Sequence, residues 1–200
     1  MTAARATRPP PPVTLDELLE RDGDVTKHVG DRPFRWHIDR RETPPDVLAF
    51  DLAAKGAYFY LGASYRSAGV VNANEARIDS AWTTTVRLAL KFAANRAGLD
   101  GTRLLVACED TNLGSAARTP LAFAAVTRYG AALAALCADE RITMVRVVAS
   151  DWQRRVLGRF PREQGKELSL ARARAEFGTA ITSNDVSDAA LLALYVRGKK

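Results

Sequence analysis

The sequence predicts an α/β domain in which helices flank a mixed central sheet, and two features carry that prediction. Three short apolar segments follow one another after tight turns, at residues 47–51, 56–62 and 68–72, which favours a three-strand antiparallel meander. Two further apolar segments, at 102–109 and 142–148, are separated by helix-like stretches, and strands joined through helices are expected to be parallel. Because 47% of the 200 residues are hydrophobic, the chain can bury a substantial core.

Helix signals alternate with the later strands. Asp79 and Ser150 are expected to cap two of the helices, and Gly98 to stop the first. The last helix follows Ser183 and Asn184, which are both good N-caps. The expected helices span residues 79–95, 120–138, 150–157, 163–177 and 185–197.

Residues 1–45 differ in composition from the remainder and are predicted to be an N-terminal extension to a domain at 46–200. The proline-rich start, residues 1–12, is expected to be a disordered arm. A capping-box pattern then predicts a short helix over about residues 15–21, and residues 34–38 are strand-like.

Charge and cysteine content narrow the classes of function. Lys and Arg outnumber Asp and Glu by 29 to 23, which suits a polyanionic partner such as nucleic acid, although a merely solvated basic face is the alternative. No apolar run is long enough for a membrane span and no signal peptide is evident, so a cytoplasmic protein is expected. Two cysteines and two histidines, without a CxxC motif, argue against a zinc site. The cations chosen as candidate phosphate contacts are Arg154, Arg155, Arg159 and Arg172.

Four acids are candidates for a metal site. Asp51 and Glu109 each end an apolar strand, at the sheet edge where α/β proteins bind ligands. Asp185 and Asp188 lie three residues apart in the first turn of the last helix, which puts their Cβ atoms roughly 5–6 Å apart. Acids in a first helical turn also complement the helix dipole, and this simpler explanation stays open. Asp110 alternates with Glu109 and is expected to face the other way. Clustered carboxylates favour a hard cation such as Mg²⁺.

The ordered acids Asp51, Glu109 and Asp185-x-x-Asp188, on a strand meander followed by alternating helices and strands, resemble the RuvC family of Holliday-junction resolvases in the RNase H-like superfamily. The resemblance covers roughly residues 46–197. The stretch from Ser150 to Glu167 is similar to the family segment that carries an active-site lysine, and the match makes Lys166 that lysine.

The resemblance implies two-metal hydrolysis of DNA phosphodiesters, with two Mg²⁺ ions about 3.5–4 Å apart and Mn²⁺ as a substitute. Asp51 would bridge the ions, Glu109 and the Asp185/Asp188 pair would complete their ligands, and the products would carry 5′ phosphate and 3′ hydroxyl. It also implies a homodimer acting on a two-fold symmetric junction. The dimer surface is expected to include Trp82, Leu88 and Phe92 unless these residues belong to the core.

Two departures from the family pattern bear on the substrate. Asp51 is followed by Leu-Ala-Ala-Lys-Gly in place of Pro-Gly, so Lys55 could reach the site. Asn112 stands where the family carries an aromatic residue that contacts bases, which predicts little dependence on the crossover sequence. The alternatives are an RNase H-like nuclease acting on flaps, forks or RNA–DNA hybrids, and a non-catalytic junction-binding protein.

Overall fold

The computed structural model describes residues 23–29, 32–38, 44–53, 55–72, 80–110 and 120–198, and the chain divides into two units, Met1–Glu42 and Thr43–Lys200. In the first unit, strands β1 (Gly23–Val29) and β2 (Arg32–Ile38) pair antiparallel. The sequence signal at 34–38 falls within β2, whereas β1 was not anticipated. The arm expected at 1–12 and the helix expected at 15–21 lie outside the described residues.

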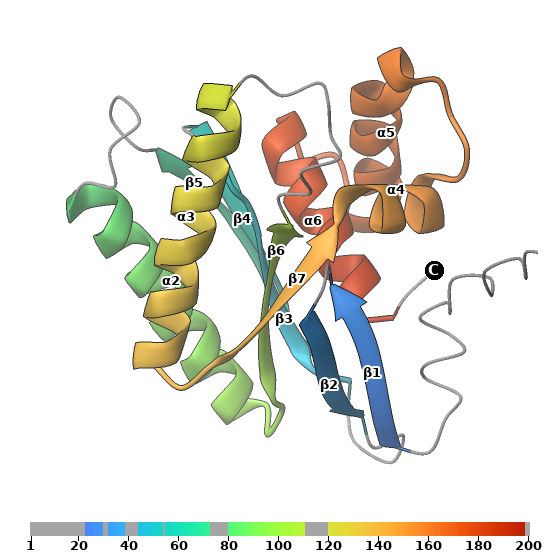
Figure 1. The fold of residues 1–200 in the computed structure, drawn as a ribbon. Helices are drawn as coiled ribbons and strands as arrows, with labels where there is room; N and C mark the ends of the chain where they lie inside the picture. The colour runs from blue at the N-terminus through green and yellow to red at the C-terminus, as the bar shows by residue number, and fades with distance from the viewer. Residues whose placement is uncertain are drawn as a thin grey trace, which may run out of the picture. The chain divides into compact units, whose positions relative to one another are not determined.

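The second unit is built on a mixed sheet with the strand order β5-β4-β3-β6-β7 (Figure 1). The first three strands of this unit pair antiparallel, and β6 pairs parallel with both β3 and β7. The predicted meander followed by parallel strands is therefore confirmed. The strands are β3 (Asp46–Asp51), β4 (Lys55–Leu61), β5 (Arg66–Asn72), β6 (Leu104–Asp110) and β7 (Thr143–Val148).

Helices cover both faces of this sheet and make a three-layer domain (Figure 1). Helices α2 (Ser80–Leu99) and α3 (Pro120–Asp139) pack on one face. On the other face α6 lies against β3 and β4, and α4 and α5 pack against α6. These three helices are α4 (Ala149–Leu157), α5 (Gly165–Phe177) and α6 (Asn184–Val196). None of the described helices combines the length and the apolarity needed to cross a membrane.

The central strands alternate their side chains between the two helical layers. Leu48 and Phe50 of β3, with Val106 and Cys108 of β6, are fully buried in the core under α2 and α3. Full burial of such side chains stabilises the fold by about 1.5–3 kcal/mol each. The intervening residues of β3 and β6 face α6, which is buried around its whole circumference from Ala189 to Val196.

Two helix N-termini contrast with each other. The cap predicted at Ser183 is confirmed, because its Oγ accepts a hydrogen bond from the Val186 backbone N–H at 3.2 Å. The cap predicted at Ser150 is wrong. Strand β7 runs directly into α4, so the cap position is Val148, which offers no side-chain hydrogen bond. The cap predicted at Asp79 lies outside the described residues.

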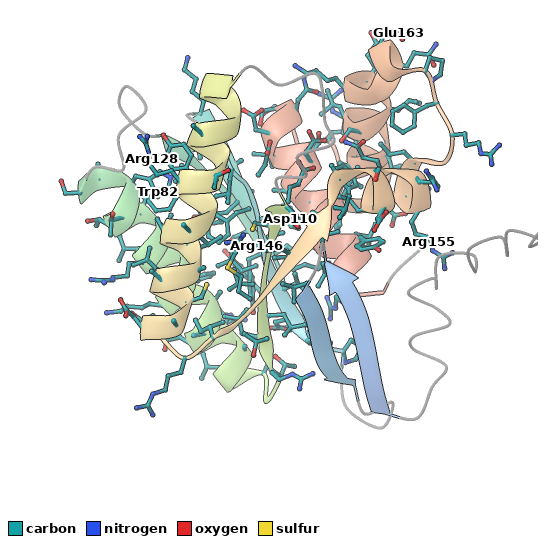
Figure 2. All side chains as sticks on the ribbon, viewed as in Figure 1. Trp82, Asp110, Arg128, Arg146, Arg155 and Glu163 are labelled. Atoms are coloured by element: carbon teal, nitrogen blue, oxygen red, sulfur yellow. The ribbon has the colours of Figure 1, made fainter. Side chains whose placement is uncertain are left out.

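Trp82 belongs to the core and not to an exposed dimer surface, so that part of the prediction is wrong. Its side chain is 1% exposed and packs against Tyr129, with ring centroids 5.5 Å apart (Figure 2). The reason is its place on the side of α2 that meets α3. Leu88 and Phe92, from the same prediction, are 63% and 39% exposed.

Candidate metal centre

Asp51 and Glu109 end neighbouring parallel strands at the same edge of the sheet. In the pairing of β3 with β6, the last two residues that face each other are Phe50 and Cys108. Asp51 and Glu109 are the next residue on each strand. Because side chains alternate along a strand, both acids project from the face that α6 covers. Both are half-buried. The sheet register thus brings together two carboxylates that are 58 positions apart in the chain (109 − 51).

The N-terminal end of α6 adds two more acids, Asp185 in its first turn and Asp188 three residues later. Asp188 is half-buried, and the loss of hydration there is the main cause that raises its pKa from 3.8 to about 6. The charges of Glu109 and Asp185 raise the pKa further, whereas a hydrogen bond from Ser169 and the charge of Lys166 lower it. Asp188 therefore lies within electrostatic reach of three of the other residues chosen from the sequence. For Asp51, the strand register is what places it beside Glu109.

Two buried donors contact the carboxylates, and the sequence did not single out either one. The Trp152 Nε1–H of α4 donates to Glu109 Oε1 at 2.8 Å, and the Ser169 hydroxyl of α5 donates to Asp188 Oδ1. A signal for Trp152 did exist: it is the one aromatic residue in a polar stretch, Ser150–Arg155, so it should turn inward, where its N–H needs an acceptor. Ser169 carries no comparable signal, since a serine is common on any helix.

Lys166 acts on an acid of the candidate metal centre, whereas Asp110 lies on the other face of the sheet. Lys166 is exposed on the first turn of α5, and its charge acts on Asp188. Asp110 follows Glu109, so strand alternation directs it to the α2–α3 face. The charges of Asp110 and Arg146 both act on the pKa of the buried Cys108 thiol (Figure 2 labels both residues).

The four acids carry donor atoms that suit a divalent cation, but their side chains do not form a closed coordination site. Across the described residues, no group of three or more His, Cys, Asp or Glu side chains is close enough to hold a metal ion. The donors, however, are all carboxylate oxygens, the ligands that Mg²⁺ prefers. Asp188 is also half-buried within electrostatic reach of two other acids, an arrangement that a cation would stabilise. In the chemistry of their donor atoms, the residues therefore fit a hard divalent ion.

The four candidate phosphate contacts are not equivalent. Arg154 and Arg155 lie exposed in the last turn of α4, and Arg159 is exposed just beyond it (Figure 2 labels Arg155). Arg172 forms an ion pair of 2.6 Å with Glu176 along α5, which engages part of its guanidinium. Lys55 is exposed at the start of β4, and Asn112 lies outside the described residues.

The class that the structure defines is one of fold: a mixed five-stranded sheet lies between two helical layers, which is an RNase H-like fold. It is the fold of RuvC. The structure of RuvC from Thermus thermophilus matches with a TM-score of 0.50 and 13% identity, over 74% of this chain and 91% of that one. RuvC from T. thermophilus in complex with Holliday junction substrate matches with a TM-score of 0.52 and 11% identity, over 75% and 90%.

A third solved structure, the yeast mitochondrial Holliday junction resolvase Ydc2, matches with a TM-score of 0.36 and 16% identity, over 77% of this chain and 80% of that one. No protein-family model matches the sequence, and no curated protein matches it. The similarity to these solved structures is therefore one of fold.

Proposed function

We propose that this protein is a structure-selective endodeoxyribonuclease that resolves four-way DNA junctions by metal-dependent hydrolysis of phosphodiesters. The observation that carries the proposal is that Asp51 and Glu109 end neighbouring parallel strands at the ligand-binding edge of a RuvC-like sheet, with the half-buried Asp188 of α6 within electrostatic reach of Glu109. A protein that only bound DNA would gain nothing from several acids gathered where phosphates must come. An enzyme that holds cations there would need them.

The residues divide into ligands and a counter-charge. Asp51, Glu109, Asp185 and Asp188 would hold two Mg²⁺ ions, for which Mn²⁺ substitutes. When bound, these ions supply the charge that activates water and stabilises the leaving 3′ oxygen. Lys166, exposed and near Asp188, would offset the charge that develops on the phosphate as a point cation. Products with 5′ phosphate and 3′ hydroxyl are expected.

The proposed substrate is tested by comparing single-turnover cleavage rates on a four-way junction, a flap, a replication fork and an RNA–DNA hybrid of shared sequence. The same carboxylates could cut any of these, so only relative rates separate them. The junction is expected to be cut at least tenfold faster, a difference of about 1.4 kcal/mol in activation free energy. Faster cleavage of flaps, forks or hybrids would reassign the substrate while leaving the metal site in place.

The exposed cations at the end of α4 are proposed to contact DNA phosphates. Replacing Arg154, Arg155 and Arg159 together with alanine is expected to weaken junction binding and to reduce the slope of log K against log[salt] by up to about 2.7, or 0.9 for each phosphate that is no longer neutralised. Fluorescence anisotropy at several salt concentrations measures this slope. Arg87→Ala, an exposed cation on α2, is the control and should leave the slope unchanged. A triple variant with the wild-type slope would remove these residues from the interface.

We also propose a homodimer, because a four-way junction is two-fold symmetric and must be cut on two strands. The outer surface of the α2–α3 layer is the proposed contact. It exposes Leu88 and Phe92 on α2, together with a stripe of small residues at helical spacing on α3 that lets a second helix approach closely. That stripe comprises Ala131, Ala135 and Ala138.

Leu88→Glu is therefore expected to shift the protein from dimer to monomer in sedimentation velocity at micromolar concentration. Leu168→Glu, at an exposed leucine on α5, is the matched control and should stay dimeric. A wild-type protein that sediments as a monomer would contradict the dimer. A dimer that survives Leu88→Glu would move the interface elsewhere.

A further inference from the structure

Trp152 combines two properties that a packing residue alone does not need. Its side chain is 0% exposed, and it is one of two buried residues on α4, the other being Val156. Its Nε1–H donates to a carboxylate oxygen of Glu109 at 2.8 Å. Indole nitrogen is a donor only, so a buried tryptophan needs an acceptor, and here that acceptor is a residue of the candidate metal centre.

Other features of the fold make this contact specific. Glu109 ends β6, whereas Trp152 lies 43 residues later on a helix that packs against both α6 and β7. The hydrogen bond occupies one oxygen of Glu109 from the protein side, so the carboxylate loses rotational freedom about its side-chain bonds. Carboxylates that bind metals are commonly held by such outer hydrogen bonds, and removing the outer partner typically weakens metal binding roughly 10- to 100-fold.

We propose that Trp152 is a positioning residue for Glu109, holding its carboxylate in the orientation that receives a divalent cation. The inference rests on the proposed function, since it concerns the same site. It assigns to α4 a second role beside carrying arginines: the helix joins the basic surface at its C-terminal end to a carboxylate of the centre through one buried side chain.

The test replaces Trp152 with phenylalanine, which keeps an aromatic ring and removes the N–H. Trp82→Phe is the matched control, because Trp82 is equally buried but packs on Tyr129 at the opposite face of the sheet. Metal affinity is measured by isothermal titration of the DNA-free protein with Mn²⁺. Trp152→Phe is expected to bind Mn²⁺ about 10- to 100-fold more weakly, while Trp82→Phe keeps the wild-type affinity. Excess metal should restore cleavage by Trp152→Phe.

A second measurement does not depend on the folding of Trp152→Phe. The chain has three tryptophans, so a ¹⁵N-labelled sample gives three indole N–H resonances at most. The Trp152 resonance is expected to shift when Mg²⁺ is added and when Glu109 is replaced by glutamine, while the Trp82 resonance stays in place. Trp152→Phe identifies the peak; if that variant does not fold, Trp36→Phe and Trp82→Phe identify the other two peaks and leave that of Trp152.

Equal Mn²⁺ affinity in the Trp152→Phe and wild-type proteins would overturn the proposal. Indole resonances that all keep their positions in Glu109→Gln would also overturn it. If either result is found and the wild-type protein still cuts junctions in Mg²⁺, only the role of Trp152 is contradicted and the proposed function stands. If the wild-type protein binds no divalent metal, both the proposed function and the role of Trp152 are contradicted.

Discussion

Replacing Asp51 or Asp188 with asparagine is expected to lower junction cleavage by at least 10³-fold, about 4 kcal/mol in activation free energy, while junction affinity stays the same. Each substitution removes one carboxylate from the candidate centre and leaves the exposed arginines of α4 in place. Cleavage is followed on denaturing gels in Mg²⁺, and affinity by gel shift in EDTA.

Asp110→Asn is the matched control for both variants. Asp110 is the residue after Glu109 and loses the same charge, but strand alternation directs it to the α2–α3 face. It should cut at the wild-type rate. Undiminished nicking by Asp51→Asn and Asp188→Asn would remove these acids from the reaction.

The second large effect is on stability. Asp188→Asn is expected to stabilise the metal-free protein at pH 7.5, because the wild-type carboxylate must be charged in a half-buried place beside Glu109 and Asp185. Its pKa is about 6 in the folded protein against 3.8 ordinarily, so the folded state binds the proton more tightly than the unfolded state. Stability therefore falls as pH rises from about 4 to about 6. Two pKa units correspond to about 3 kcal/mol, and asparagine avoids that cost.

Thermal unfolding in EDTA at pH 7.5 should show a higher Tm for Asp188→Asn, by about 2 to 4 °C per kcal/mol in a chain of this size. At pH 3.5 the difference should largely vanish, since the wild-type carboxyl is then protonated, which makes acid pH an internal control. Added Mg²⁺ should raise the Tm of the wild-type protein more than that of the variant. A variant no more stable than wild type at pH 7.5 would contradict the burial of a charged Asp188.

The sheet and the helices that flank it were predictable because they rest on local patterns. Short apolar segments between turns marked β3 to β5, and the helix expected at 120–138 is observed as Pro120–Asp139. The predictions were wrong where the packing of another element decides the position of a residue. Trp82 is buried because α3 lies against it, and Ser150 is not a cap because β7 leaves no loop before α4.

The centre was predictable in part for the same reason. The positions of Asp51 and Glu109 at strand ends are readable from the sequence, and parallel register then sets them side by side. The donors Trp152 and Ser169 were not found, because each meets its carboxylate only through the packing of α4 and α5 around α6. No pattern within α4 or α5 reports that packing.

The central claim is that acids from β3, β6 and α6 form one divalent-metal site, and anomalous diffraction from crystals soaked in Mn²⁺ tests it most directly. Two Mn²⁺ peaks are expected among Asp51, Glu109 and Asp188, with the carboxylates drawn closer than in the metal-free protein. Crystals of Asp188→Asn should lose at least one of these peaks. Mn²⁺ bound elsewhere on the molecule, with no peak at these carboxylates at saturating metal, would contradict the claim.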